Sequence, residues 1–267
     1  FEPLKDKYKW GSNPFYYFAG LNSIHPSFVQ EMLSEESFQP EDIHSNLNYL
    51  NSVGGKKFSK ELITLGKNFY KKINKGSWSP LKLLKKKDVL IIGPGQSTLK
   101  YKDKLIKFIL KNKPIVFVLN AIKPVPEKYI DARIVCHTLR LLSDIDKYKK
   151  FNTNLITPYS SFSKNVKSRI KFKNVLDFGL QVKNYKFKFE ENFVILPNSL
   201  AITYALGICT SGDSKRIFLI GLDGYTQNNP KKFAMDELFQ NYKLENKAKK
   251  IFSLTPTNYK IKVIKKI

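Results

Sequence analysis

Short apolar runs alternate with amphipathic stretches from residue 88 onward. Residues 89–92 and 115–119 are wholly apolar, and residues 217–220 repeat this pattern, which is typical of strands buried on both faces of a parallel sheet. Weaker runs predict further strands at 132–136, 154–157, 175–178, 193–196 and 261–264. Helical periodicity predicts helices at 99–112, 199–210 and 233–250. We therefore expect an α/β fold: a Rossmann-like, mostly parallel sheet with helices on both faces.

The first 75 residues have a different pattern. Apolar residues recur at helical spacing after Pro40, and Gly54-Gly55 is typical of a helix end. No segment here predicts a strand, so we expect an all-α N-terminal appendage. Gly, Ser, Pro and Lys dominate residues 76–87. This break divides the chain into a helical appendage, 1–80, and a Rossmann-like domain, 81–267, that is expected to fold independently.

The composition bounds the class of protein. Hydrophobic residues make up 42% and aromatic residues 13% of the chain, which is enough for a sizeable core. No apolar run approaches the ~20 residues of a membrane-spanning helix. The two cysteines, Cys136 and Cys209, lie in apolar segments, which favours a reducing compartment over a disulfide framework. We expect a cytoplasmic protein.

The net charge of +25 bears on partners. Only four of the 47 basic residues are arginines, and no nucleic-acid motif accompanies the lysines, so no specific nucleic-acid binding is expected. The lysines are either a general solvated surface or a surface attracted to an anionic membrane or an anionic saccharide acceptor.

Four loops after predicted strands carry candidate chemistry, because ligands of open parallel sheets bind where the strands end. The first contains Gly93, Gly95, Gln96 and Ser97. Its glycines would let a phosphate approach the backbone, and the next helix presents free N–H groups. On this hypothesis a side chain at Gly95 abolishes binding with little loss of stability. The alternative is a tight turn in which Ser97 caps the helix.

The other loops contain Asn120, Asn198 with Ser199, and Asp223 with Tyr225. Each asparagine either binds a base or sugar or caps its turn, and Ser199 either binds ligand or caps a helix. Asp223 and Tyr225 are expected to face the ligand. Because all these residues follow predicted parallel strands, we expect them at one edge of the sheet.

Asp223 and His137 are the candidate catalytic residues, although His137 is equally well explained as a polar strand end. The chain has no His, Cys or carboxylate cluster at metal-ligand spacing. No metal site and no cofactor are therefore expected in this chain.

Two stretches resemble known families. Residues 4–11 (LKDKYKWG), 16–20 (YYFAG), 24–33 (IHPSFVQEML) and 54–58 (GGKKF) resemble the region after the barrel in HMG-CoA-lyase-like aldolases, often called 4-hydroxy-2-oxovalerate aldolases. This resemblance implies a C-terminal fragment of a longer protein. Its aldolase barrel, with a divalent metal, would lie upstream of Phe1.

Residues 89–99 (VLIIGPGQSTL), 118–120 (VLN) and 198–225 resemble sialyltransferases of glycosyltransferase family 42 and DUF115-type proteins. The resemblance implies that Gly93, Gly95, Ser97, Asn120, Asn198, Ser199 and Tyr225 hold a CMP-sugar. Pro94 and Gln96 depart from the family pattern. The segment that corresponds to the family's catalytic histidine, residues 253–259, contains no histidine.

Two functions follow from these patterns. The first is a glycosyltransferase-like domain that binds a nucleotide-activated sugar, CMP-sugar favoured, for surface polysaccharide synthesis. The second is a non-catalytic ligand-binding or assembly domain of an aldolase. The complete set of loops favours the first, and the missing histidine favours the second.

Overall fold

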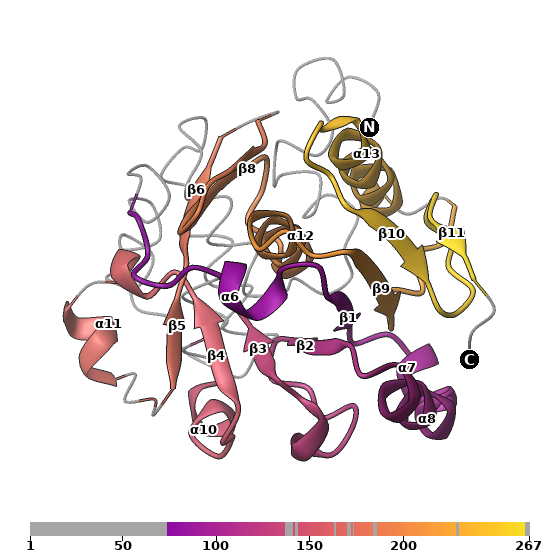
Figure 1. Ribbon diagram of the computed structural model, residues 1–267, viewed down its shortest axis with the longest axis horizontal. Coiled ribbons are helices and arrows are strands. Elements are labelled where there is room, and N and C mark those ends of the chain that lie inside the picture. Colours follow the sequence, from indigo (N-terminus) through magenta and orange to yellow (C-terminus); the bar gives the residue numbers. More distant parts are fainter. Residues whose placement is uncertain are drawn as a thin grey trace, which may run out of the picture.

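The computed structural model describes residues 74–136, 141, 144–162, 164–169, 172, 174–183, 186–227 and 230–264. The predicted helical appendage, 1–80, lies outside the described residues except for residues 74–80, and residues 4–58, which carry the aldolase resemblance, lie wholly outside them. The α/β fold is confirmed (Figure 1).

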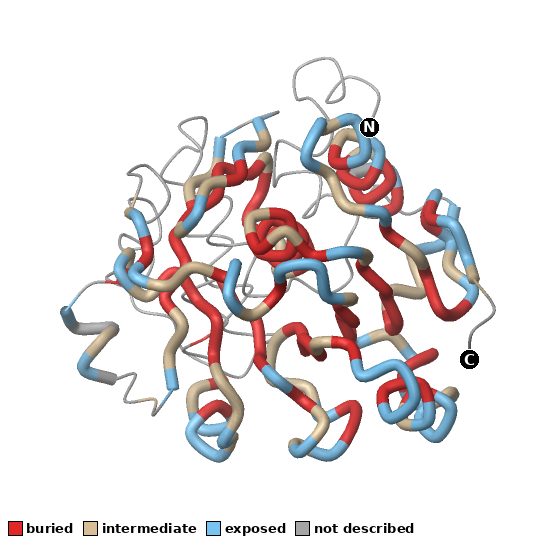
Figure 2. Tube along the Cα trace, viewed as in Figure 1, coloured by how far each residue is buried: buried red, intermediate tan, exposed pale blue. Residues whose placement is uncertain are grey.

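The main sheet has eight strands in the order β11-β10-β9-β1-β2-β3-β4-β5, and every neighbouring pair is parallel. Its strands are β1 (Asp88–Ile92), β2 (Ile115–Leu119), β3 (Ala132–Ile134), β4 (Asn154–Thr157), β5 (Val175–Asp177), β9 (Arg216–Ile220), β10 (Lys250–Ser253) and β11 (Lys262–Val263). The central strands β1, β2 and β9 are buried except at their first residues (Figure 2). The apolar runs at 89–92, 115–119 and 217–220 thus correctly predicted a sheet covered on both faces.

Helices cover both faces of this sheet. On one face, α8 (Lys102–Asn112), which follows the short α7 (Ser97–Lys100), packs Leu105 and Phe108 against β1, β2 and β9. On the other face lie α12 (Ala201–Ser211) and α13 (Pro230–Leu244), whose Thr210 and Tyr242 hydroxyls are 2.7 Å apart. The other helices of the described residues are short: α6 (Leu81–Leu84), α10 (Ile145–Tyr148) and α11 (Lys164–Arg169), with 3₁₀ turns η1 (Glu127–Tyr129) and η2 (Tyr159–Ser161).

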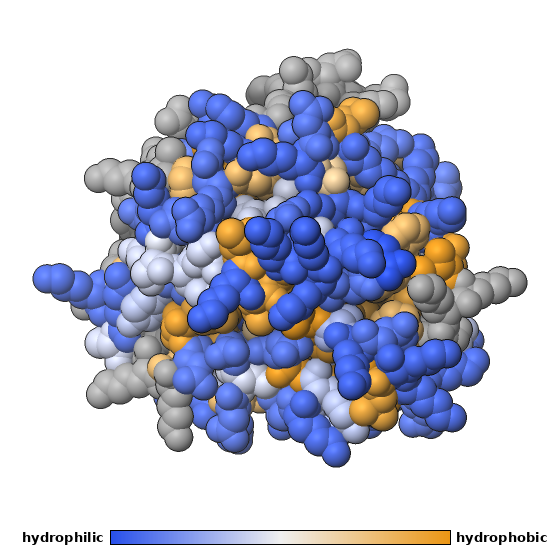
Figure 3. Space-filling view, in the orientation of Figure 1, coloured by the Kyte–Doolittle hydropathy of each residue, from blue (hydrophilic) through white to orange (hydrophobic). Residues whose placement is uncertain are grey.

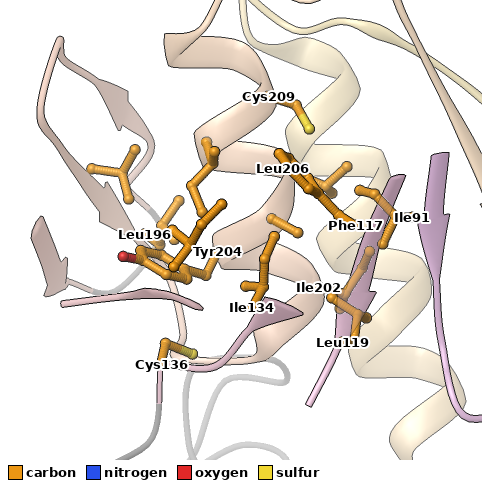
Figure 4. Close-up of a cluster of buried hydrophobic side chains, with 14 of the residues drawn as sticks. Ile91, Phe117, Leu119, Ile134, Cys136, Leu196, Ile202, Tyr204, Leu206 and Cys209 are labelled. Carbon is orange, nitrogen blue, oxygen red and sulfur yellow. The ribbon is translucent and has the colours of Figure 1, made fainter. Parts of the chain in front are cut away.

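Helix α12 is the centre of the larger core. In Figure 4 its Ile202 and Leu206 lie beside Leu119 and Phe117 of β2, and its Tyr204 lies beside Leu196 of β8 (Phe193–Leu196). A second, three-stranded sheet packs on α12 from the other side, with the order β6 (Gly179–Val182), β8, β7 (Lys188–Phe189). Gly207 allows the close approach, because a Cβ there would lie 3.1 Å from Val194.

Two predictions about elements were wrong. The run at 193–196 is a strand, β8, but it belongs to the second sheet and not to the main one. Residue 250 was predicted as the end of a helix, yet it begins β10, which pairs with β9. Lysines surround β10, so its alternating buried residues Ile251 and Ser253 gave only a weak strand pattern.

Residues 76–84 pack on the α/β domain. The N–H of Gly76 donates to Asn192 O (3.0 Å) and that of Trp78 to Asp177 O (3.0 Å), while the Trp78 ring meets Phe178 edge-on. Leu84 of α6 is fully buried against Gly212.

We expect a fragment of residues 74–267 to unfold cooperatively. A fragment of 88–267 loses Trp78 and Leu84, and we expect its free energy of unfolding to fall by roughly 3 kcal/mol or more, because each lost side chain leaves a cavity. Urea unfolding followed by circular dichroism measures both. Equal urea midpoints of the two fragments would show that residues 74–87 contribute nothing to stability. A non-cooperative transition of the 74–267 fragment would contradict an independently folding domain.

Candidate functional site

The strand order reverses at β1. From β1 the chain builds β2 to β5 on one side, and it returns to add β9, β10 and β11 on the other. Ligands of open α/β sheets bind at such a switch point, outside the ends of the strands. The loops that follow β1 and β9, residues 93–97 and 221–225, therefore occupy the expected ligand position. We call the edge where the main-sheet strands end the carboxyl edge.

Backbone hydrogen bonds join these two loops. The N–H of Gly93 donates to Ile220 O (2.8 Å), and that of Gly95 donates to Gly221 O (2.8 Å). The pairing of β1 with β9 thus continues beyond the strands. Gly221 has a positive φ of 71°, which turns the second loop away after these contacts.

Asp223 completes the junction. Its carboxylate accepts the Ser97 backbone N–H (2.9 Å) and, in a short contact, the Ser97 hydroxyl. Ser97 Oγ also accepts the Gly221 N–H (3.2 Å). An aspartate carboxylate that receives N–H groups at the start of a helix takes the place of a bound anion there. Asp223 thus positions the glycine loop, and the N–H groups of Gly93, Gly95 and Ser97 are engaged by the chain itself.

The prediction that a side chain at Gly95 causes little loss of stability is wrong. A Cβ at Gly95 would lie 2.7 Å from both Asp223 Oδ2 and Gly221 O. A Cβ at Gly93 would lie 2.5 Å from Gly221 O. Both glycines are required by the contact between the loops, so a side chain at Gly95 disturbs the fold whether or not a ligand binds.

Asn120 follows β2 at the same edge. Its φ of 60° lies in the left-handed region, which asparagine tolerates better than most residues. Its N–H donates to Ile134 O (2.9 Å), and its carbonyl lies 3.5 Å from a guanidinium nitrogen of the buried Arg133. Asn120 thus ends β2 with a left-handed turn, and its half-buried side chain lies at the carboxyl edge.

Asn198 and Ser199 reach the carboxyl edge by another route than predicted, because they follow β8 of the second sheet. The Asn198 side-chain oxygen accepts the Leu200 N–H (3.2 Å) and the Thr203 hydroxyl (2.7 Å), so it organises the first turn of α12. The Cys136 thiol, just beyond β3, donates to the Ser199 carbonyl (2.8 Å). This contact places the positive end of α12 beside the main sheet.

Tyr225 lies two residues beyond Asp223 and is 37% exposed. Its ring meets Tyr259 edge-on at 6.4 Å. Burial raises the pKa of the Tyr225 phenol, and that of the more deeply buried Tyr259 rises further. Both phenols therefore stay neutral near pH 7 and keep their proton for donation. Gln96, directly before Ser97, is exposed.

The segment from Ser253 to Tyr259 closes the site, and sequence reasoning assigned it a place only by resemblance. The Thr257 hydroxyl donates to Leu222 O (2.7 Å), and the Asn258 N–H donates to Asp223 O (2.8 Å). Thr255 Oγ1 lies 3.3 Å from Ser97 Oγ. In the sequence, the run of hydroxyl and amide side chains in residues 253–259 was the signal that could have marked this segment as part of the site. Only the pairing of β10 with β9 brings the segment beside residues 221–224.

Of the predicted site residues, Gly93, Gly95, Ser97 and Asp223 meet directly, and Gln96 and Tyr225 adjoin them. Asn120, Asn198 and Ser199 lie along the same edge, nearer the ends of β2 and β3. His137 lies outside the described residues. Within the described ranges, no group of three or more His, Cys, Asp and Glu side chains has the arrangement of a metal site.

Comparison with known proteins gives a likeness in structure but none in sequence. No protein-family model and no curated protein matches the sequence. The structure is similar to the MAf glycosyltransferase from Magnetospirillum magneticum AMB-1, with a TM-score of 0.46 and 11% identity. The match covers 91% of this chain and 48% of that one, so the present chain spans about half the length of its relative.

No helix in the described part of the chain is both long enough and apolar enough to cross a membrane.

We expect Asp223→Ala to lower the free energy of unfolding by about 1–3 kcal/mol, because Ser97 loses the acceptor for its N–H and hydroxyl. Asp223→Asn keeps one acceptor oxygen and should lose less. Asp103→Ala, at an exposed position in the first turn of α8, is the control and should change stability by less than about 0.5 kcal/mol. Urea titration measures all three, and equal stability of Asp223→Ala and the wild type would refute the positioning role.

Proposed function

We propose that the α/β domain is glycosyltransferase-like and binds a nucleotide-activated sugar at the carboxyl edge. One observation carries the proposal: the loops that follow β1 and β9 meet at the switch point of the strand order. Asn120 and the start of α12 lie along the same edge. The nucleotide is proposed to be a cytidine monophosphate carrying an acidic sugar, as the sequence resemblance implies.

The phosphate is proposed to lie beside Tyr225 and Gln96. The Ser97–Asp223 contact brings these neighbouring residues to one part of the edge. A neutral phenol and an amide each donate a hydrogen bond to a phosphate oxygen, and bonds to a charged partner are the strong ones. The backbone of the glycine loop then supports these side chains in place of binding the phosphate itself. Base and ribose are proposed to lie toward Asn120 and Asn198.

Sugar transfer at this place requires a proton acceptor. The acceptor hydroxyl attacks the anomeric carbon while the bond from that carbon to the phosphate oxygen breaks, and the nucleotide leaves with the electron pair. The hydroxyl proton must pass to a base. Asp223 is the proposed base if substrate binding releases it from Ser97, and His137, next to Cys136 in the chain, is the other candidate.

The second candidate function is a non-catalytic ligand-binding or assembly domain joined to an aldolase. The observation that favours it concerns residues 253–259. This segment lies against the loop with Asp223, where the resemblance implies a catalytic histidine, and it holds threonines and an asparagine instead. Under this function a nucleotide binds without turnover or does not bind at all.

We expect Tyr225→Phe to weaken CMP binding about ten- to a hundredfold, because it removes one hydrogen bond to a charged group worth roughly 1.5–3 kcal/mol. Tyr129→Phe is the matched control, since Tyr129 precedes β3 at the other end of the sheet, and it should bind CMP like the wild type. Isothermal titration calorimetry of the full chain measures each affinity.

The same titration can refute the glycosyltransferase proposal. If the wild-type chain binds none of CMP, UDP and GDP at millimolar concentration, the glycosyltransferase proposal fails and the assembly function takes its place. Equal loss in both tyrosine variants would place the nucleotide elsewhere.

A further inference from the structure

The edge opposite the candidate site, where the main-sheet strands begin, is strongly basic. In the parallel register Val89 pairs with Ile115, and Lys87 and Lys113 each lie two residues earlier in the chain, so both precede neighbouring strands at this edge. Asp88 pairs with Arg216, which brings Lys215 beside Lys87, and the Lys215 N–H donates to Lys87 O (2.7 Å). Because neighbouring strands lie about 4.8 Å apart, the segments that carry these lysines meet at one edge of the sheet.

More lysines lie at this edge. We call the following exposed residues the basic edge: Lys82, Lys85, Lys86, Lys87, Lys111, Lys113, Lys215 and Lys250. The N–H of Lys86 donates to Asp213 O (2.9 Å), which joins α6 to the chain that leads into β9. Helix α6 lies near the middle of the view in Figure 1, and hydrophilic side chains cover much of the same face in Figure 3.

Three aspartates at this edge have partners outside the basic edge, although Lys85 and Lys86 also help Lys249 to lower the pKa of Asp213. Asp88 pairs with Arg216 (2.5 Å) and Asp213 with Lys249 (2.5 Å), while the Asp131 carboxylate accepts the Val116 N–H (2.7 Å). Among the ion pairs of the described residues, none includes a lysine of the basic edge. Like charges at one edge repel one another, and an anionic partner relieves that repulsion.

Two exposed leucines flank the lysines. Leu81, 39% exposed, begins α6, and Leu110, 55% exposed, lies near the end of α8, three residues before Lys113. Lysines interspersed with exposed leucines are typical of surfaces that lie on a lipid bilayer. Among the described residues the exposed large aromatics are Tyr225 and Phe233, and both lie outside the basic edge, so its described part offers no platform for stacking bases.

We propose that the basic edge is a docking surface for an anionic lipid bilayer. The lysines contact lipid phosphates, and Leu81 and Leu110 enter the interfacial layer. Because the parallel strands end at the opposite edge, a docked chain directs the carboxyl edge toward the water. The inference does not depend on the proposed nucleotide site.

The test is co-sedimentation of the full chain with lipid vesicles at low salt. One set of vesicles is phosphatidylcholine alone, and in the other roughly a third of the lipid is phosphatidylglycerol. Binding is expected only to the anionic vesicles and should be lost at about 0.5 M NaCl. The variant Lys82→Gln/Lys85→Gln/Lys215→Gln should lower the partition coefficient about a hundredfold, since each lysine near the surface contributes about fivefold.

The control variant is Lys100→Gln/Lys102→Gln/Lys104→Gln, which removes the same charge near the carboxyl edge, where α7 ends and α8 begins. It should lower the partition coefficient less than about fivefold. Leu81→Asn/Leu110→Asn keeps the charge and should weaken binding about three- to tenfold.

Three results would overturn the proposal. They are equal binding to neutral vesicles, an equal effect of the two triple variants, and binding of single-stranded DNA or dextran sulfate through the basic edge while anionic vesicles stay unbound. Circular dichroism melts of each variant confirm that a loss of binding is not a loss of fold.

Discussion

The parallel pairing of the eight main-sheet strands is the constraint on which the rest of the structure depends. Since every strand points the same way, all loops after strands meet at one edge and all segments before strands meet at the other. Residues more than a hundred positions apart, such as Ser97 and Asp223, become hydrogen-bonded neighbours for this reason. The same constraint gathers the lysines that precede β1, β2 and β9, and Lys250 at the start of β10, at the opposite edge.

The contact between Ser97 and Asp223 makes the site rigid, and it also satisfies the Ser97 N–H without a ligand. A helix start with free N–H groups attracts any anion, and here a carboxylate of the chain is the nearest one. The glycines of the first loop serve this internal contact, because Cβ atoms at Gly93 or Gly95 would collide with the second loop. Recognition of a phosphate is thereby left to exposed side chains such as Gln96 and Tyr225, which the rigid loops hold in place.

The two edges of the sheet differ in chemistry. Near the ends of β1 and β9 lie amides, hydroxyls and one carboxylate, which suit directed hydrogen bonds to a small polar ligand. The segments before these strands carry exposed lysines with few acidic partners, which suit an extended anionic surface. A ligand at one edge and a surface at the other can be bound together, because the sheet and its covering helices separate them.

The sequence by itself determined the fold class and most strands, because strands buried on both faces need continuous apolar runs, and these can be read locally. It also located the loops after β1, β2 and β9, since glycine, asparagine and aspartate follow those runs directly. It could not reveal β10, whose pattern lysines obscure, or the place of β8 in a second sheet, because both depend on long-range pairing. Only the tertiary structure decided that Gly95 faces Asp223, that residues 253–259 close the site and that scattered lysines form one edge. These are contacts between distant segments, and no local pattern of residue types encodes them.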